Sequence, residues 1–426
     1  MTPQGAAACD LPAVEALTHE VEAGRVEGRF QGHRLTSHFQ PIISLTHQRP
    51  VGYEALLRVQ DATGAPLSPL VPFAHCAHVG QTVLLDRLSR YLHVRNFLSQ
   101  GGAESAWLFL NVHPLTIAHG KGHGPYFAHL LERYGIAPSR IVIEILEAQI
   151  QDETALVRAV DYYKDLGCLV AIDDFGTGHS NFSRVWDIRP EIVKLDRSLV
   201  VRAAHDKRVR RLLPNLMAMI NESGGLTLME GIEREDEAMI ALETGVDLVQ
   251  GYLFGRPGPL RPGHDGAQQA LITQLAAQMH TLSALERQRL GGLLEPYRLA
   301  FNQAAARLRA GQGLEQAVAE LLRLPRAERC YLLNHEGRQI GGNIEAPHTL
   351  HAFDHRFAPV LDAAGAQWNQ RYYFRRAMAQ PGELQLSRPY RSIIGGNQCV
   401  TLSLAFEAGP AGRYQVFCAD VDWSET

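Results

Sequence analysis

Apolar and polar positions along residues 34–258 follow two different periods. Eight short apolar runs have the length and the β-branched content of buried strands, and longer amphipathic stretches separate most of them. In one such stretch, LVRAVDYYKDLG, Gly167 is placed to end a helix. Strands alternating with helices over about 225 residues predict a closed (β/α)8 TIM-like barrel. The strand-like runs are SHFQPIISL, VGYEALLRV, AWLFLNVHP, RIVIEILEA, CLVAIDDF, EIVKLD, LTLMEGI and DLVQGYLF.

The pattern changes on both sides of the barrel region. The segment that follows the barrel region is rich in Ala, Leu, Gln and Arg. Its apolar residues Leu271, Leu275, Met279 and Leu282 have helical spacing. We interpret this segment as a helix that connects two domains or mediates dimerisation, although ordinary core packing explains the spacing equally well. The chain is therefore divided into a short helical lead-in (1–33), an α/β barrel (34–262), a helical linker (263–322) and a small α+β domain (323–426).

The last segment has the alternation and turn residues of an antiparallel sheet. ERCYLLNHEGRQIGG predicts two strands around an Asn-His-Glu-Gly turn, and GNQCVTLSLAFEAG with GRYQVFCADVDW predicts a hairpin. The stretch SRPYRSIIGGNQCVTLSL resembles a strand-turn-strand element of PAS- or Cache-like sensor domains. That resemblance implies a sensory or dimerising role and an unidentified small ligand. Arg388, Tyr390 and Arg391 are candidates for lining its pocket, and packing or surface roles account for them equally.

Charged side chains end five successive strand-like runs of the barrel region. Charge is costly on buried strands unless it is paired or binds a metal. Active sites of barrels lie at the C-terminal ends of the strands. We therefore expect one polar site at one rim, built from Glu54, Glu144, Asp173, Asp174, Lys194 and Glu230.

Strand alternation sorts these residues by face. Glu54, Leu56 and Arg58 share one face of their strand, although an arginine in such a place is often only solvated. Glu144 and Glu147 fall on opposite faces, so they are expected to do different work.

The adjacent Asp173 and Asp174 cannot both point inward from a regular strand. We expect the strand to end there, with Gly176 and Gly178 in the loop that follows. Asp173 then faces the barrel axis and Asp174 reaches sideways.

Several carboxylates and the amide of Asn111 are the oxygen ligands that Mg²⁺ or Mn²⁺ prefers. Two such ions about 3.5–4 Å apart could share one carboxylate, activate water and stabilise charge on a phosphodiester. A zinc site would show His or Cys ligands, which these strand ends lack. Lys194 could orient the water, or it could be a plain ion-pair partner of Asp173 or Asp174.

In these residues and the motifs around them, the chain resembles the EAL-domain family of cyclic-di-GMP phosphodiesterases over roughly residues 34–258. The motif that names the family is Glu54-Ala55-Leu56, extended to Arg58. DDFGTG in the same order makes the likeness specific. Two departures are Met229, where alanine is usual, and His179, where tyrosine is usual. The other matching segments are HFQPI, LNVHP, IEILE, VKLD, MEGIE and VQGYLFGRP.

The resemblance implies a role for each residue. Two Mg²⁺ or Mn²⁺ ions would be held, the first by Glu54, Asn111, Glu144 and Asp173, and the second by Asp173, Asp174 and Glu230. Lys194 would hold the attacking water near Gln250, and Glu147 would brace the loop after Asp174. Cyclic di-GMP would meet Gln40 and Arg58, with Asp196 as a neighbour, and would be hydrolysed to linear pGpG by a homodimer.

Composition and terminal sequence bear on which partners the protein binds and in which compartment it is expected. The chain is 46% hydrophobic and 20% charged with a net charge of -4, which disfavours a general nucleic-acid surface. The N-terminal residues lack the pattern of a signal peptide, and no apolar stretch reaches the ~18 residues of a membrane span. The six cysteines form no CxxC pair and fit reduced thiols. We expect a cytoplasmic protein.

Because every ligand of the family pattern is present, we expect an active hydrolase. The alternative is a catalytically silent receptor that binds cyclic di-GMP and acts through protein contacts. A barrel that has lost its substrate is a third possibility.

Overall fold

The structure, a computed structural model, describes residues 10–22, 24–101, 106–119, 125–146, 153–176, 182–260, 266–349, 362–393, 396–408 and 413–424. Its internal contacts divide the chain into two compact units, Met1–Leu282 and Ser283–Thr426. Each unit has its own core and is described by itself.

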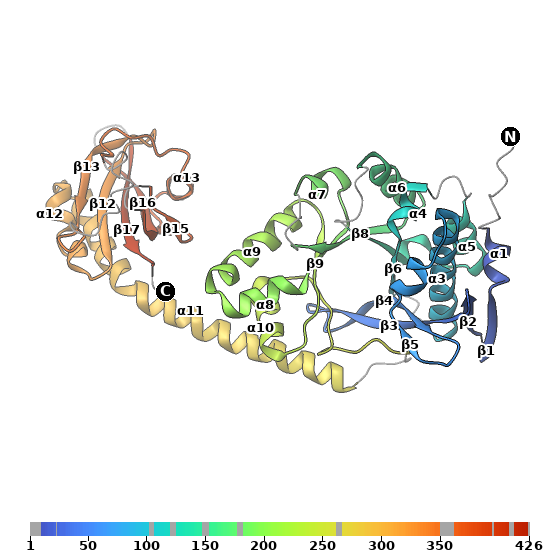
Figure 1. Ribbon diagram of the computed structural model, residues 1–426. Helices are drawn as coiled ribbons and strands as arrows, with labels where there is room; N and C mark the ends of the chain where they lie inside the picture. Colours follow the sequence, from blue (N-terminus) through green and yellow to red (C-terminus); the bar gives the residue numbers. More distant parts are fainter. Residues whose placement is uncertain are drawn as a thin grey trace. The chain divides into compact units, whose positions relative to one another are not determined.

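The first unit is a closed eight-stranded barrel (Figure 1), which confirms the predicted fold class. All eight strand-like runs of the sequence form its strands. Seven neighbouring pairs follow one path around the sheet, and pairing of the first strand with the second closes it. The strands are β3 (His33–Ser44), β4 (Arg49–Gln60), β6 (Trp107–Asn111), β7 (Ile141–Leu146), β8 (Leu169–Phe175), β9 (Ile192–Leu195), β10 (Leu226–Met229) and β11 (Leu248–Val249).

Strand β3 departs from the simple alternation of strands and helices. It runs antiparallel to both of its neighbours, β4 and β11, whereas the other barrel strands pair in parallel. Only residues 45–48 separate β3 from β4. A parallel crossover needs a dozen or more residues, so this short connection permits only a hairpin.

Helices cover the outside of the barrel and bury its outward-facing side chains. The short strand β5 (Pro66–Leu67) pairs with β4 in the antiparallel direction, and a 3-10 turn (Pro138–Arg140) precedes β7. The helices are α2 (Leu70–Ala74), α3 (Val79–Ser99), α4 (Pro114–His119), α5 (Tyr126–Tyr134), α6 (Glu153–Asp165), α7 (Phe182–Ile188), α8 (Arg197–His205), α9 (Lys207–Glu222) and α10 (Glu235–Thr244).

The helical interpretation of residues 1–33 is wrong for most of the described lead-in. Only α1 (Leu11–Glu15) is helical, and β1 (Thr18–Glu22) and β2 (Arg25–Phe30) form a hairpin that extends the sheet beside β3. Gly24, with φ +82°, supplies the left-handed turn between the two strands.

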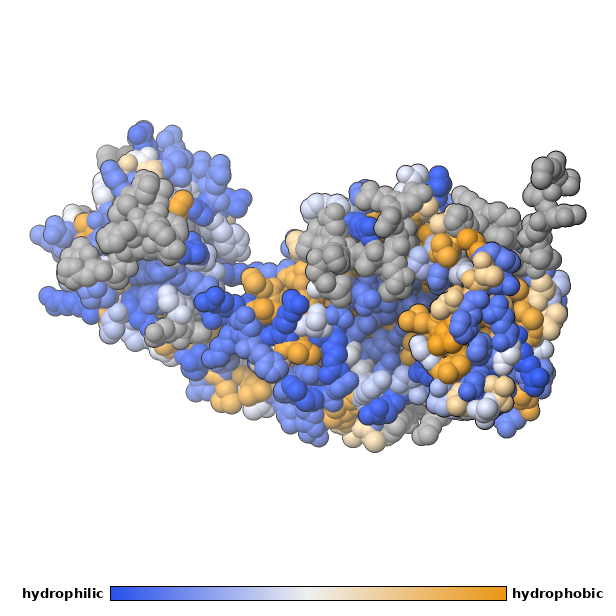
Figure 2. Space-filling model, in the orientation of Figure 1, coloured by the Kyte–Doolittle hydropathy of each residue, from blue (hydrophilic) through white to orange (hydrophobic). Residues whose placement is uncertain are grey.

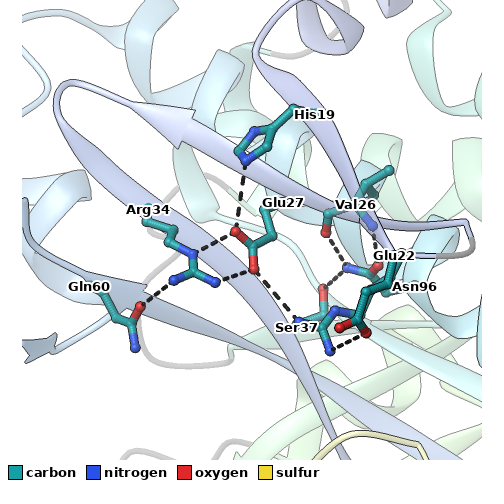
Figure 3. A network of polar contacts seen from close by, with 9 residues as sticks. His19, Glu22, Val26, Glu27, Arg34, Ser37, Gln60 and Asn96 are labelled. Carbon is teal, nitrogen blue, oxygen red and sulfur yellow. Dashed lines mark hydrogen bonds and ion pairs between the residues drawn. The ribbon is translucent and has the colours of Figure 1, made fainter. Parts of the chain in front are cut away.

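A buried carboxylate joins this hairpin to the barrel. Figure 3 shows Glu27 of β2 between Arg34 of β3 and His19 of β1. The hydrogen bonds from Arg34 lower the pKa of Glu27. Asn96 of α3 exchanges two hydrogen bonds with the backbone of Val26, at 2.8 and 2.9 Å. Tertiary pairing thus stabilises a segment whose sequence has few apolar residues.

Helix α11 (Gly266–Arg309) begins in the first unit and ends in the second. Ile272 and Leu275 are buried in the barrel core, while Leu282 is 51% exposed. Tyr297 and Phe301, near its other end, belong to the core of the second unit. The predicted helix therefore exists, and its apolar positions serve core packing at both ends; its role in dimerisation stays a prediction.

The second unit is built around an antiparallel sheet in the order β13-β12-β17-β16-β14, with β15 also paired to β16. Both predicted strand pairs are confirmed. Phe301 of α11 stacks on Phe417 with ring centroids 4.3 Å apart. The elements are α12 (Leu314–Val318), a 3-10 turn (Leu321–Arg323), β12 (Ala327–Leu333), β13 (Gln339–Glu345), α13 (Tyr372–Ala379), β14 (Gln385–Leu386), β15 (Tyr390–Arg391), β16 (Gln398–Glu407) and β17 (Tyr414–Asp422).

On the face drawn in Figure 2, apolar patches are broken up by polar side chains, as is usual for a water-exposed surface. Within the described residues, none of the helices combines the length and apolarity that crossing a bilayer requires.

Candidate metal centre at one mouth of the barrel

A layer of apolar side chains fills the barrel interior and sets the position of the site. Seven strands contribute one buried residue each to this layer: Ile42, Phe109, Val142, Ala171, Ile192, Leu228 and Leu248. Side chains two positions apart on a strand point the same way. The next inward positions on four of these strands are Asn111, Glu144, Asp173 and Lys194, and Glu230 and Gln250 take the same places directly after the ends of β10 and β11.

The two remaining positions come from β3 and β4. Because β3 is antiparallel, the residue beyond its layer position is Gln40, two places before Ile42. On β4 the layer position is Gly52, and Glu54 follows it. Gln40 pairs with Glu54 in the β-ladder, so all eight strands place a polar group in one layer.

Lys194 of β9 is the centre of this polar layer. Its Nζ lies 2.6 Å from Oε1 of Glu144 and 2.6 Å from Oε1 of Glu230. Oδ1 of Asp173 lies 3.3 Å away and Oε1 of Glu54 4.0 Å away. The lysine side chain is 1% exposed, so four carboxylates compensate one buried cation.

Amide side chains hold Glu54 in place. Gln250 donates through Nε2 to Oε2 of Glu54 at 2.7 Å and to Oε1 of Gln40 at 3.2 Å. Asn111 donates through Nδ2 to Oε1 of Glu54 at 3.1 Å, and Gln40 donates to the carbonyl of Gly255 at 3.1 Å. These bonds and the charge of Lys194 outweigh burial and lower the pKa of Glu54.

The adjacent aspartates occur in a bulge, and the predicted end of the strand at Asp174 is wrong. Strand β8 continues to Phe175, and its register against β9 shifts between Ile172 and Phe175. Asp174 has φ +59°, a left-handed conformation that non-glycine residues rarely adopt. The bulge lets both carboxylates reach the same mouth, because the extra residue breaks the alternation of faces.

Asp173, Asp174 and Glu230 can present carboxylate oxygens that all lie within 4.8 Å of one another. This spacing suits one divalent cation, as predicted for the second ion. The residues predicted for the first ion meet at the same layer: Asn111 and Lys194 each contact Glu54, and Lys194 also contacts Glu144 and Asp173.

The electrostatics of the site fit a bound cation. Burial raises the pKa of Glu144 well above its ordinary value and that of Glu230 to about 8, and the neighbouring carboxylates add to both effects. Burial also raises the pKa of Asp174. Glu144 is 1% exposed, and apart from its ion pair with Lys194 its oxygens have no hydrogen-bond partner among the described residues. Such oxygens suit a Mg²⁺ or Mn²⁺ ion.

Two predicted substrate contacts lie nearer the rim. Arg58 continues the inward face of Glu54; burial lowers its pKa, and its Nη1 donates to the carbonyl of Leu57 at 3.0 Å. Asp196 accepts a hydrogen bond of 2.9 Å from the amide of Ser198 and caps α8. Oδ1 of Asp196 is therefore used to cap the helix.

Some predicted features fall outside the described residues, among them Glu147, Gly178 and His179. Sequence reasoning alone did not reach Gln40 or Gln250, which entered through the resemblance. The signal that finds them is strand parity: each lies two positions from an interior apolar residue, Ile42 or Leu248.

The model of the EAL domain matches residues 23–257, more than half of the chain. The chain belongs to the EAL domain family. This confirms the resemblance stated from the motifs. Met229, where alanine is usual, packs in the apolar core outside the interior layer to which its neighbour Leu228 belongs, so its side chain lies on the face opposite to that of Glu230.

Two curated EAL relatives are named as phosphodiesterases. The cyclic di-GMP phosphodiesterase RocR of Pseudomonas aeruginosa is 28% identical over 60% of this chain and 64% of its own. The probable cyclic di-GMP phosphodiesterase PdeB of Escherichia coli is 26% identical over 55% of this chain and 45% of its own. The chain thus spans about half to two thirds of the length of these relatives.

A solved EAL structure resembles the chain beyond the barrel. The Bacillus subtilis YkuI protein, crystallised in complex with substrate c-di-GMP and calcium, covers 92% of this chain and 96% of its own with a TM-score of 0.73. Its sequence identity is 22%, so the likeness bears on the fold alone.

Proposed function

We propose that the protein is a metal-dependent phosphodiesterase that hydrolyses cyclic di-GMP to linear pGpG, with residues 34–262 as its catalytic domain. The observation that carries this proposal is the convergence of four carboxylates from four strands on the buried Nζ of Lys194. RocR and PdeB support it, because both are named as phosphodiesterases of this nucleotide.

The acidic residues would hold two divalent ions. We assign the first to Glu54, Asn111, Glu144 and Asp173 and the second to Asp173, Asp174 and Glu230. When bound, Mg²⁺ or Mn²⁺ supplies Lewis acidity that favours hydroxide over water and neutralises phosphate charge. Asp173 would serve both ions in this assignment, because it lies beside Asp174 and Glu230 and also contacts Lys194, which is in contact with Glu54 and Glu144.

Lys194 and Gln250 would position the attacking water. Glu144 and Glu230, each 2.6 Å from Nζ, would accept two of the three ammonium protons of Lys194 and keep it in place, and the third proton would be donated to the water oxygen. Attack of the water oxygen on phosphorus would form the new P–O bond and break the bond to the 3′-oxygen. The 3′-oxygen would take up the proton that the water loses, so that the ring opens to pGpG. Gln40, Arg58 and Asp196 would contact the dinucleotide, and Arg58 would offset its phosphate charge.

The assay is incubation of the purified chain with cyclic di-GMP and Mg²⁺ or Mn²⁺, with pGpG measured by chromatography. We expect turnover that Glu54→Gln reduces by about a thousandfold or more, as for loss of a metal ligand and its charge. Glu22→Gln is the control, because Glu22 is 77% exposed on β1. Binding of cyclic di-GMP without pGpG would identify the receptor alternative, and neither binding nor turnover would refute both.

The C-terminal domain would regulate this activity, and a homodimer is the expected assembly. The support is the continuous helix α11, which contributes buried residues to the cores of both units. Comparing turnover and sedimentation of the full chain with those of a chain ending at Leu282, where the first unit ends, tests this proposal. Unchanged turnover and unchanged oligomer size would rule it out.

A further inference from the structure

The second unit contains a cavity of about 460 Å³ that the phosphodiesterase proposal does not use. One wall is the start of α13, and the other is the segment that leads from β14 to β15. The volume lies in the range of pockets for small organic ligands. Six of its lining residues matter here: Arg371, Tyr373, Ser387, Arg388, Pro389 and Tyr390.

The cavity is positively charged. Arg371 and Arg388 both line it, and within the described residues neither takes part in a salt bridge and no carboxylate lines the cavity with them. Arg388 is exposed, so water weakens the repulsion between the two charges, and an anion in the cavity would be attracted to both. Guanidinium groups are well suited to carboxylates, which they bind through two parallel hydrogen bonds.

The helix that begins at the cavity adds to this field. Arg371 is the N-cap residue of α13, and no side chain caps the amides of the first turn. The N-terminus of a helix carries a partial positive charge and unpaired N–H groups. The cavity, the two arginines and the helix end therefore all favour an anion.

The remaining wall is aromatic and held in place. The rings of Tyr373 and Tyr390 are stacked, with centroids 6.2 Å apart and planes 25° apart. Thr401 donates to Asp420 at 2.7 Å, which leaves its oxygen to accept the hydroxyl proton of Tyr390 at 2.7 Å. The hydroxyl of Tyr390 thus bonds to Thr401 rather than to a ligand, whereas its ring can pack against a flat apolar group.

We propose that this cavity binds a small planar organic carboxylate, whose anionic end meets Arg371 and Arg388 and whose flat body packs against Tyr373 and Tyr390. Arg388 and Tyr390 were candidates from the sequence. Arg391, the third candidate, does not line the cavity, and its Nε donates to the carbonyl of Gly396 at 2.7 Å.

The test is isothermal titration of the full chain, in a Tris-chloride buffer, with three probes. Benzoate has the carboxylate and the flat ring, benzamide is its neutral counterpart, and acetate has the carboxylate alone. We expect saturable binding of benzoate at one site and at least about tenfold weaker binding of the other two.

The paired variants are Arg371→Gln/Arg388→Gln and the control Arg375→Gln. Arg375 lies exposed on the same helix but does not line the cavity, so it controls for the loss of an arginine outside the cavity. The double variant should bind benzoate at least about tenfold more weakly, while the control keeps wild-type affinity. Circular dichroism verifies that each variant is folded. Absence of saturable benzoate binding up to about 10 mM, equal binding by the double variant, or equal binding of benzamide would overturn the proposal.

Discussion

Nζ of Lys194 lies 2.6 Å from a carboxylate oxygen of Glu144, and the two side chains are only 1% and 0% exposed. Neither charge is stable alone in the barrel interior, because desolvation of an unpaired ion is costly. The surrounding carboxylates raise the pKa of Lys194 despite its burial, so the lysine stays charged. The lysine is therefore a permanent counter-ion of the proposed metal ligands.

Replacing this counter-ion should destabilise the metal-free barrel. We expect Lys194→Met to lower the free energy of unfolding by about 3–5 kcal/mol, since it leaves buried carboxylates uncompensated. Denaturant unfolding in the presence of a chelator measures this. Millimolar Mn²⁺ should restore part of the loss, because the ion binds the folded state alone.

Lys164→Met is the matched control for this variant. Lys164 is 26% exposed and pairs with Glu191 at 2.9 Å near the surface, where a single ion pair contributes at most about 1 kcal/mol. Equal effects of the two substitutions would contradict the counter-ion role of Lys194.

The two proposed ions should be separable by substitution. Asp174→Asn removes a carboxylate from the group Asp173, Asp174 and Glu230 only, so we expect Mn²⁺ binding to fall from two ions to one. Asp173→Asn should weaken both ions, since Asp173 also meets Lys194 beside Glu54. Electron paramagnetic resonance of free Mn²⁺ gives the stoichiometry.

Asp206→Asn serves as the control for these aspartates. Asp206 caps α9 by accepting from the amide of Arg208 at 2.7 Å, and asparagine caps equally well. Retention of two ions by Asp174→Asn would show that the second ion has other ligands.

The apolar layer under the site should tolerate no added methyl at Gly52. A Cβ there would lie 2.8 Å from Phe109 and 3.2 Å from Trp107. Overpacking of this kind costs about 1–3 kcal/mol, which thermal unfolding would show as a lower Tm for Gly52→Ala. The double variant Gly52→Ala/Phe109→Leu should recover part of the loss, because leucine vacates the position of the ring.

A glycine with open space provides the comparison. Gly342 lies in β13, where an added methyl meets nothing within 4 Å, so Gly342→Ala should change the Tm little. If Gly52→Ala were as stable as this control, the interior layer would be able to rearrange around the added methyl group.

Much of the barrel and its site could be predicted from the sequence, because both depend on the alternation of side chains along strands. The step of two from Val142 to Glu144, or from Ile192 to Lys194, is a local pattern that survives folding. The bulge at Asp174 was not readable, because it is set by pairing with β9 rather than by the strand itself.

Long-range pairing also explains the errors at the N-terminus. The hairpin β1–β2 contains few apolar residues, and tertiary contacts support it. Asn96 of α3, 70 positions away, exchanges hydrogen bonds with the backbone of Val26, and Arg34 of β3 pairs with Glu27. The antiparallel direction of β3 could have been inferred, since a four-residue connection excludes a crossover.

The second unit should lose stability as the pH rises from about 4.5 to 7. Glu328 is 5% exposed on β12, and burial raises its pKa to about 7. The folded state therefore binds a proton that the unfolded state releases near pH 4.5, so the stabilisation is complete below that pH and is lost as the pH passes 7. The loss is at most about 3 kcal/mol.

Hydrogen exchange of β12 and β17 amides at pH 5 and pH 8, corrected for intrinsic rates, measures this loss within the full chain. Glu328→Gln keeps the shape of the side chain and its contact with Asn397 but cannot ionise. Its amide protection should therefore depend less on pH than that of the wild type, and the dependence that remains comes from Glu345 and Asp420, whose pKa values burial also raises. Glu383→Gln, at an exposed position, should behave like the wild type. If wild-type protection rises between pH 5 and pH 8, Glu328 is ionised in the folded protein and Arg329, whose guanidinium lies 3.6 Å away, compensates its charge.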